Sequence, residues 1–253
     1  MVKKLLLITL LALLFSCKET SVTTMTSAST LALLEKSKAI QLRAERVEKN
    51  MRKWQDSLDR FQDQEAVQNS IKDDEFVDIE KLSNYFVLDM PYATTNNFLK
   101  KAVYSCAKCY VRGKVATALI KANKEFMKKG YRIKLFDCYR PYSVQKKMWK
   151  IFPNPGYVAD PKGGSVHNRG AAVDITLTDL KGNPLDMGTK FDHFGKEAHH
   201  AYKELSEEVI ANRTLLRKIM EKYGFSIIRT EWWHYNFKSD IKFKISDFRW
   251  KCN

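Results

Sequence analysis

The pattern of hydrophobic and polar positions divides the chain into three parts. A short apolar run from Leu5 to Phe15 follows two lysines near the N-terminus. From Leu31 to about Gln68 there is no proline or glycine, and apolar residues recur among charged residues and glutamines at roughly helical spacing. We expect one long amphipathic helix here, or a helix with a break near Asn50. The third part begins near Asp74 and is long enough for one substantial hydrophobic core.

This third part contains both strand and helix patterns. Alternating or β-rich stretches predict extended segments, and apolar residues at helical spacing predict helices. The expected extended segments are residues 86–90, 97–104, 131–137, 170–180 and 226–237, and the expected helices are residues 113–130, 144–152 and 211–225. The two types do not alternate strictly, and the late strands are close enough in sequence for antiparallel pairing. We therefore predict an α+β fold, in which helices flank a central, mainly antiparallel sheet and the long N-terminal helix precedes it.

The N-terminal segment is typical of an exported lipoprotein. Its apolar run is too short to cross a bilayer as a mature helix and suits a cleaved signal peptide. Leu14-Phe15-Ser16-Cys17 resembles a bacterial lipobox, which implies that Cys17 is lipidated and becomes the first residue of the mature protein. We expect the protein outside the cytoplasm, on the periplasmic side, attached to a membrane by its N-terminal lipid. A plain secretory signal with an incidental cysteine is the alternative.

These observations predict four segments. Residues 1–16 are the signal peptide, and the Ser/Thr-rich residues 17–30 form a flexible tether. Residues 31–73 form a helical spacer, which either serves as a stalk or lies against the globular part. Residues 74–253 form the globular domain.

Net charge does not indicate a nucleic-acid partner. Lys and Arg number 44 and Asp and Glu number 29, which gives a formal net charge of +15. Such a balance is compatible with nucleic-acid binding, but the lysines are dispersed and no nucleic-acid-binding motif is present. Attraction to anionic lipid or cell-wall polymer is the simpler explanation for an exported protein, and we predict no nucleic acid.

The cysteines after Cys17 suit disulfide bonds. These residues are Cys106, Cys109, Cys138 and Cys252. Cys106 and Cys109 form a C-x-x-C pair, which is a weak metal signal without a second matching pair. An oxidising compartment favours disulfides, and four cysteines allow three complete pairings between which the sequence does not choose.

Two stretches carry a concentration of chemically active residues. His167 lies in a loop rich in Gly, Ser and Asn, and Asp174 interrupts the apolar stretch Ala171–Leu177. Glu231 and His234 lie among large aromatic residues. Buried acids and imidazoles are unfavourable unless a partner or a metal satisfies them. His167, Asp174 and His234 offer three N/O ligands with an open fourth position, as in a catalytic zinc site, and Glu231 is then a candidate general base.

The spacing of Glu231 and His234 places a condition on such a site. Residues three apart on a regular strand point to opposite faces. Both side chains reach one site only if a bulge, a strong twist or a strand end lies near Trp232. A core strand with one hydrogen-bonded His–Glu pair is the alternative, and the helical HExxH motif of other metallopeptidases is absent.

Several short motifs occur in a fixed order along residues 74–238. The pattern S-x-H-x-x-G-x-A-x-D runs from Ser165 to Asp174, and E-W-W-H-Y occupies residues 231–235. Further motifs are Y-A-T at residues 92–94, D-C-Y-R-P at 137–141, M-G-T-K-F-D at 187–192 and the stretch 212–225. In order and approximate spacing, this set resembles the D-alanyl-D-alanine dipeptidases of the VanX type. The wider fold also includes D,D-carboxypeptidases and the hedgehog signalling domain.

The resemblance implies an activity and a metal. The activity is zinc-dependent hydrolysis of the D-Ala-D-Ala dipeptide, linked to the turnover of peptidoglycan precursors. One Zn²⁺ per chain is implied, with His167, Asp174 and His234 as its ligands. Glu231 is implied as the base that activates the water at the metal.

The resemblance also implies how the substrate is held. Arg140 would stabilise the oxyanion, and Asp137 would orient Arg140. Asp192 and Tyr92 would hold the free ammonium of the dipeptide, and Ser165 would hold its other end. Arg140 could instead only pair with Asp137, and Asp192 could be a loop or cap residue.

Some residues depart from the pattern or compete with it. Where the family usually has Asp-Gly-Tyr, this chain has Tyr104-Ser105-Cys106, so one contact to the substrate is expected to differ. His193, His199 and His200 are rival ligands for which we expect supporting roles.

Two alternative functions are a D,D-carboxypeptidase that trims longer peptidoglycan peptides and a non-catalytic lipoprotein that binds cell-wall peptides.

Overall fold

The computed structural model describes residues 27–252, with side chains from residue 30 onward except those of residues 50, 51 and 53–69. The predicted signal peptide, the lipidation site at Cys17 and most of the predicted tether lie outside the described residues. The chain divides into two units, residues 1–60 and residues 61–253. Within residues 27–252, no helix combines the length and the apolar character needed to cross a bilayer. The predicted segment boundaries stay predictions.

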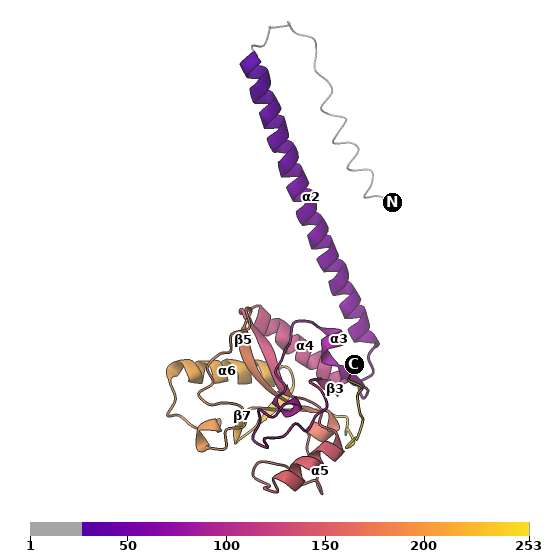
Figure 1. Ribbon diagram of the computed structural model, residues 1–253, viewed down its shortest axis with the longest axis vertical. Coiled ribbons are helices and arrows are strands. Elements are labelled where there is room, and N and C mark those ends of the chain that lie inside the picture. The colour runs from indigo at the N-terminus through magenta and orange to yellow at the C-terminus, as the bar shows by residue number, and fades with distance from the viewer. Residues whose placement is uncertain (1–26, 253) are drawn as a thin grey trace. The chain divides into compact units, whose positions relative to one another are not determined.

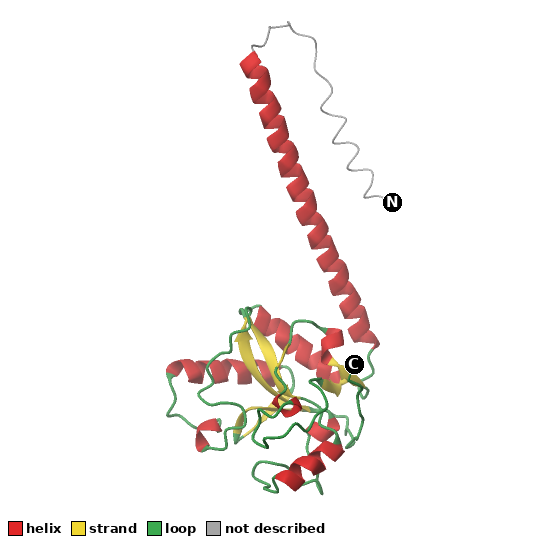
Figure 2. Ribbon diagram, viewed as in Figure 1, coloured by secondary structure: helices red, strands yellow, loops and turns green. Residues whose placement is uncertain are grey.

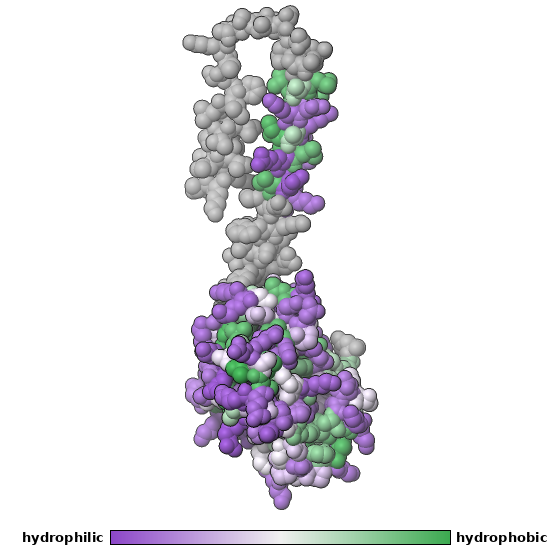
Figure 3. Space-filling model, turned by 90° about the vertical axis from the view of Figure 1, so that its left-hand side faces the viewer, coloured by the Kyte–Doolittle hydropathy of each residue, from purple (hydrophilic) through white to green (hydrophobic). Residues whose placement is uncertain are grey.

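Helix α2 (Ser27–Ser70) is a single helix of 44 residues (Figure 1). It begins before the expected start, inside the predicted tether, and runs through residue 50 without a break. In its described part, large apolar side chains are exposed at Leu31, Leu33, Leu34, Ile40, Leu42 and Val47. Figure 3 shows hydrophobic and hydrophilic side chains alternating along this part.

Among residues 27–252, a five-stranded sheet forms the centre of the globular unit (Figure 2). Its strands in spatial order are β2 (Val87–Leu88), β4 (Tyr131–Asp137), β5 (Ala172–Asp179), β7 (Glu231–Phe237) and β6 (Phe225–Ile228). β2 runs parallel to β4, and the other neighbouring strands of this sheet are antiparallel. A two-stranded sheet pairs β1 (Phe76–Asp78) with β3 (Tyr110–Arg112). The predicted α+β fold with a mainly antiparallel sheet is confirmed.

The globular unit also contains helices. The longer ones are α4 (Gly113–Met127), α5 (Tyr142–Ile151) and α6 (Glu207–Lys222). Shorter helical turns are α3 (Ile79–Leu82), η3 (Pro91–Ala93), η4 (His167–Arg169) and η5 (Lys196–Ala198). α4 contacts β4 and α6, and α6 contacts β6, so these two helices lie together in Figure 1. The Ser206 hydroxyl accepts the N–H of Val209 and caps α6, and Gly224 takes a left-handed conformation just beyond the helix end.

Residues 97–104 are not the extended segment that we expected. They form turns around the amide of Asn97, whose Nδ2 donates to the carbonyl oxygens of Pro91, Thr94 and Lys101. A side chain thus satisfies carbonyls that a strand would pair with a neighbouring strand. The sequence pattern did not reveal this competition.

Residues 226–237 form a hairpin and not one strand. β6 ends at Ile228 and β7 begins at Glu231, so Arg229 and Thr230 make the turn. Neither turn residue is Gly, Pro, Asn or Asp, so the usual turn signal is absent. α5 and α6 also begin before their expected starts, at Tyr142 and Glu207.

Two disulfides cross-link the described residues, Cys106–Cys252 and Cys109–Cys138. The cysteines of the C-x-x-C pair therefore bond to different partners. Cys109–Cys138 joins the approach to β3 to the end of β4. Cys106–Cys252 attaches the C-terminal tail, whose Trp250 ring stacks on Tyr110 with 5.4 Å between ring centres.

Candidate metal centre

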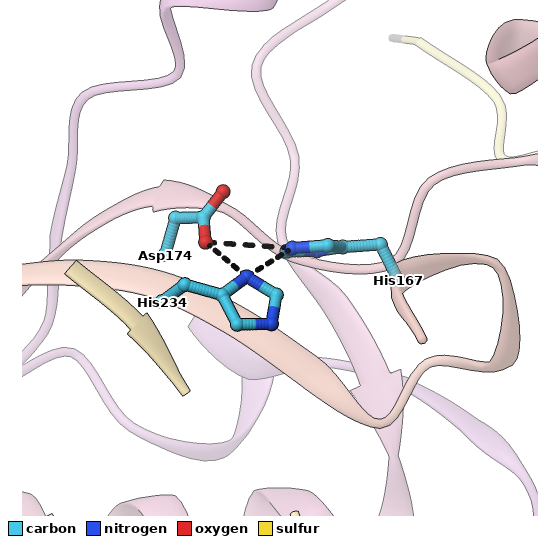
Figure 4. A group of neighbouring side chains, drawn as sticks. All are labelled: His167, Asp174 and His234. Carbon is cyan, nitrogen blue, oxygen red and sulfur yellow. Dashed lines mark hydrogen bonds and ion pairs between the residues drawn. The ribbon is translucent and has the colours of Figure 1, made fainter. Parts of the chain in front are cut away.

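Three predicted ligands come from separate parts of the chain and meet at one point (Figure 4). His167 opens η4, Asp174 lies in β5 and His234 lies in β7. Asp174 and His234 are direct partners in the antiparallel ladder, so the sheet places them side by side. The backbone N–H of Arg140 donates to the His167 carbonyl, and Gly170 takes a left-handed conformation (φ 70°) where the chain leaves η4 for β5.

The side-chain atoms form a compact triangle. Nδ1 of His234 lies 3.0 Å from Oδ1 of Asp174 and 3.2 Å from Nε2 of His167. The third distance, between Nε2 of His167 and Oδ1 of Asp174, is 3.4 Å. A tetrahedral zinc ion with bonds of about 2.0–2.1 Å separates its ligand atoms by roughly 3.3 Å. The triangle fits such an ion, and it is the one group of this kind among the described residues.

The neighbours of both imidazoles decide which ring nitrogens carry protons. Nδ1 of His167 lies 2.7 Å from the carbonyl oxygen of Cys138, so this nitrogen is the donor. Nε2 of His234 lies 2.8 Å from Oδ1 of Asn236, and we assign this amide oxygen as the acceptor. In the neutral rings, Nε2 of His167 and Nδ1 of His234 therefore present lone pairs to each other and to Asp174. Three lone pairs at this distance need a cation between them.

The pKa values of Asp174 and His234 are shifted by the close approach of these groups. Burial raises the pKa of Asp174, but the charges and hydrogen bonds of His167 and His234 outweigh burial and hold the pKa below its usual range. Burial lowers the pKa of His234, but the hydrogen bond and charge of Asp174 outweigh burial and hold the pKa above its usual value. A carboxylate that stays ionised here favours a bound cation, either a proton on an imidazole or a metal.

Glu231 reaches the same site because β7 is irregular. The successive β6 residues Ile227 and Ile228 face Tyr235 and Glu231, so the intervening β7 residues form a bulge. This is the irregularity near Trp232 that the spacing of Glu231 and His234 required. Oε2 of Glu231 consequently lies 4.0 Å from Nδ1 of His234.

Glu231 also faces an opening to the surface. It lines a cavity of about 290 Å³ together with Trp233 and His193. Burial raises the pKa of Glu231, and the negative charge of Asp174 adds to the rise. A carboxylate with a raised pKa beside a metal site and an opening can accept a proton from a reacting molecule.

Arg140 is fixed in the core with hydrogen-bonding capacity left over. Its Nε and Nη2 donate to Oδ2 of Asp137 at 3.2 and 2.6 Å, and its Nη1 donates to Oε1 of Gln145 at 2.8 Å. A guanidinium has five N–H donors, so these three bonds leave one on each terminal nitrogen. Oδ1 of Asp137 accepts the Tyr104 hydroxyl at 2.6 Å and the Cys138 N–H at 2.9 Å. The predicted pairing of Arg140 with Asp137 is therefore present.

Tyr92 and Asp192 form a second polar group near this arginine. The Tyr92 hydroxyl donates to Oδ2 of Asp192 at 2.9 Å, and the Arg140 guanidinium lies 5.6 Å from the centre of the Tyr92 ring. Burial and the negative charges of Asp174 and Glu231 raise the pKa of Asp192 well above its usual value. Asp192 also has a left-handed backbone (φ 58°), which is uncommon outside glycine. A buried carboxyl of this kind would be restored to its charged form by an ammonium ligand.

Ser165 lies beside His167, one of the three predicted ligands. Its hydroxyl accepts the backbone N–H of His167 at 3.2 Å, and its own N–H donates to Oδ1 of Asn168 at 2.7 Å. The hydroxyl proton is not used by these contacts. The rival histidines lie elsewhere: His193 is exposed and pairs with Glu197, and neither His199 nor His200 belongs to the described ligand group.

Two supporting residues were not identified from the sequence. Asn236 lies two residues after His234, and in a strand this spacing places both side chains on one face, which is a signal that could have found it. Gln145 lies one helical turn into α5 from the Arg140 loop, and its Nε2 donates to the Ala159 carbonyl at 2.6 Å. Contacts between segments of this kind have no periodic signal in a sequence.

Comparisons with known proteins identify the family of this chain. A family model described as D-ala-D-ala dipeptidase matches residues 72–248. A D-alanyl-D-alanine dipeptidase of Escherichia coli (strain K12) is 34% identical over 178 residues, which are 70% of this chain and 92% of the relative. One from Enterococcus faecalis is 36% identical over an alignment of 171 residues, which covers 58% of this chain and 83% of the relative. Among solved structures, the LdcB LD-carboxypeptidase is a weak match, with a TM-score of 0.37 and 20% identity over 67% of this chain and 70% of that one.

Proposed function

The chain belongs to the D-Ala-D-Ala dipeptidase family of zinc metallopeptidases. From this premise we propose that it hydrolyses the free dipeptide D-Ala-D-Ala and that His167, Asp174 and His234 hold the zinc ion used in this reaction. The observation that carries this proposal is the triangle of lone pairs, whose distances of 3.0, 3.2 and 3.4 Å suit tetrahedral zinc. Zinc bound there would polarise the scissile carbonyl and lower the pKa of water at its open position.

We assign the proton transfers to Glu231. Its carboxylate lies 4.0 Å from a ligand nitrogen and lines the cavity, so it can reach both the metal site and an entering substrate. Glu231 takes the proton from the attacking water and afterwards delivers it to the leaving amine, so its own charge is unchanged at the end of the cycle.

We assign Arg140 to the oxygen that becomes negative when the carbonyl turns tetrahedral. Asp137 and Gln145 hold the guanidinium through three of its N–H groups, so the donors that remain are fixed before the reaction begins. Donors of this kind stabilise charge only where it develops, which lowers the barrier rather than tightening substrate binding.

Asp192 and Tyr92 support the choice of a free dipeptide. The ammonium of D-Ala-D-Ala lies close to its scissile bond, and a longer peptide has an uncharged amide there. Pairing with the ammonium would return Asp192 to its charged form, whereas an amide would leave this half-buried carboxyl without a charged partner. We place the other end of the dipeptide at the Ser165 hydroxyl.

The test is a comparison of substrates with purified, zinc-loaded protein. D-Ala-D-Ala should be hydrolysed efficiently, and N-acetyl-D-Ala-D-Ala, L-Ala-L-Ala and a wall pentapeptide little or not at all. Asp192→Asn should lose more activity on the free dipeptide than on the acetylated one. Asp89 and Asp192 both line a second cavity of about 940 Å³, and Asp89 pairs with Lys134. Asp89→Asn is therefore the matched control.

The outcomes separate the alternatives. Comparable rates on free and acetylated D-Ala-D-Ala would identify a carboxypeptidase. Zinc binding without hydrolysis of any of these substrates would identify a non-catalytic binder of wall peptides.

We also propose that the mature protein is exported and lipidated at Cys17. The lipobox-like residues Leu14–Cys17 support this, and the two disulfides suit an oxidising compartment. Incorporation of a labelled fatty acid, lost in Cys17→Ser, together with membrane fractionation would test it. Labelling that persists in Cys17→Ser would rule the site out.

A further inference from the structure

Helix α2 carries a seven-residue repeat that the dipeptidase activity does not explain. Leu33, Ile40, Val47, Trp54 and Phe61 follow one another at intervals of seven residues. The residues four positions after the first four of these are Ser37, Ala44, Met51 and Leu58, which are small or apolar. No charged residue occupies either set from Leu33 to Phe61. We call these nine positions the seam.

The seam has the spacing of a coiled coil. Alternating steps of four and three residues give a period of 3.5, whereas a straight α-helix has 3.6 residues per turn. A strict seven-residue repeat stays on one side of the helix only if the helix supercoils around a partner with the same repeat. Elsewhere on α2 the charged residues dominate, as at Lys38, Glu45 and Arg52.

The described seam side chains are exposed. Leu33, Ile40 and Val47 have 53%, 70% and 56% of their surface accessible. From Leu33 to Phe61 the seam extends over roughly 42 Å of the helix, and an isolated helix has little reason to keep an apolar seam of that length in water. Some partner is therefore needed to bury it.

We propose that α2 joins two copies of this chain in a parallel, in-register, two-stranded coiled coil. An identical helix in a second copy of the chain carries the same seven-residue repeat, so the two seams are complementary and a second copy is the simplest partner. The flanking charges favour the parallel direction: Arg43 precedes the seam residue Ala44, and Glu48 follows Val47, so Arg43 of one copy faces Glu48 of the other. In the single chain Glu48 lies 3.5 Å from Arg52, and such an exposed i,i+4 pair is weak enough to be exchanged for a pair across the seam. This proposal does not rest on the activity of the enzyme.

Cysteine cross-linking of the full-length protein in membranes tests register and direction together. Ser37→Cys and Ala44→Cys place a thiol on the seam, where parallel in-register helices bring identical positions together. Lys38→Cys and Glu45→Cys place it one residue away, on the outer surface. Mild oxidation should convert most of the seam variants to disulfide-linked dimers and leave the outer variants largely monomeric. Equal cross-linking of seam and outer variants would overturn the proposal.

A second measurement gives the number of copies. Sedimentation equilibrium in density-matched detergent should give two chains per particle for the wild type. Ile40→Lys/Val47→Lys should weaken self-association about 100-fold or more, because lysines would enter the seam. The matched control Leu31→Lys/Leu42→Lys changes two equally exposed leucines off the seam and should stay dimeric. One chain or three chains per particle in the wild type would contradict the two-stranded model, and unchanged hydrolysis of D-Ala-D-Ala per chain in each variant would show that the globular unit is folded.

Discussion

Asn236 shows how one hydrogen bond can orient a proposed metal ligand. Its Oδ1 accepts the Nε2–H of His234, which leaves Nδ1 with its lone pair toward the metal position. We expect Asn236→Ala to fold normally but to bind zinc about 10–100-fold more weakly, because the ring loses the contact that fixes its tautomer and orientation. Competition with a chelator of known affinity measures this. Asn236→Asp should restore most of the affinity, and an Asn236→Ala variant with wild-type affinity would show that the contact is incidental.

An isosteric substitution can distinguish the proposed proton-transfer role of Glu231 from the role of a metal ligand. Glu231→Gln keeps the shape of the side chain but removes its ability to accept a proton, so turnover should fall by ~10²–10⁴-fold while bound zinc stays at one per chain. Steady-state kinetics and metal analysis on the same preparation check both statements. Glu197→Gln, which changes a partly exposed glutamate paired with His193, is the control and should have little effect. Loss of zinc from Glu231→Gln would instead make Glu231 a ligand.

The residues of the candidate site differ in how well their roles can be predicted from the sequence. His167, Asp174 and His234 are recognisable because their chemistry is costly in apolar surroundings, and the structure brings them together. The conflict between the spacing of Glu231 and His234 and a regular strand was itself informative, since it required the bulge that β7 contains. Asn236 and Gln145 were missed because the sequence does not distinguish an amide side chain on a polar surface from one that supports a functional site.

At the scale of elements, the two disulfides should have different effects. Cys109–Cys138 closes 29 residues and Cys106–Cys252 closes 146, so the chain-entropy model gives the second the larger contribution to the free energy of unfolding, about 5 against about 3.6 kcal/mol. Only the first holds Cys138, whose carbonyl accepts the Nδ1–H of His167. Removing Cys109–Cys138 by a double Ala change should therefore weaken zinc binding more, and removing Cys106–Cys252 should destabilise the fold more.

Denaturant unfolding and zinc titration of the two double variants measure both effects. Each double variant serves as the control for the other, because each lacks one disulfide and keeps the other. If the same variant shows the larger loss in both measurements, stability alone explains zinc affinity and the specific role of the Cys138 carbonyl is wrong.

Elements were predicted well where one periodicity dominates. Residues 131–137 alternate clearly and form β4 over the expected range, and the apolar spacing of residues 113–130 gives α4. Predictions failed where a tertiary or side-chain contact decides, as in the turns around Asn97 and the turn at Arg229 and Thr230. The disulfide pairing also depends on which loops the sheet brings together, which the spacing of cysteines does not contain.

At the scale of the whole molecule, zinc should act as a cross-link between distant segments. His167 follows the loop beyond α5, Asp174 lies in the centre of the sheet and His234 lies in the last hairpin, so one ion would join three segments. A ligand that binds only the folded state stabilises it by RT ln(1 + [L]/Kd), which is about 4 kcal/mol at a free zinc concentration 1,000 times Kd. For a domain of this size, that corresponds to a rise in Tm of roughly 8–16 °C. Calorimetry with buffered zinc and with a strong chelator measures the difference.

Variants distinguish this effect from non-specific zinc binding. Asp174→Asn removes the charge that holds the cation, and its Tm should be nearly the same with zinc and with chelator. His193→Ala changes an exposed histidine outside the triangle, so the full shift should remain. If the shift survived in Asp174→Asn and disappeared in His193→Ala, the stabilising ion would lie outside the triangle, and the catalytic assignment built on His167, Asp174 and His234 would fail with it.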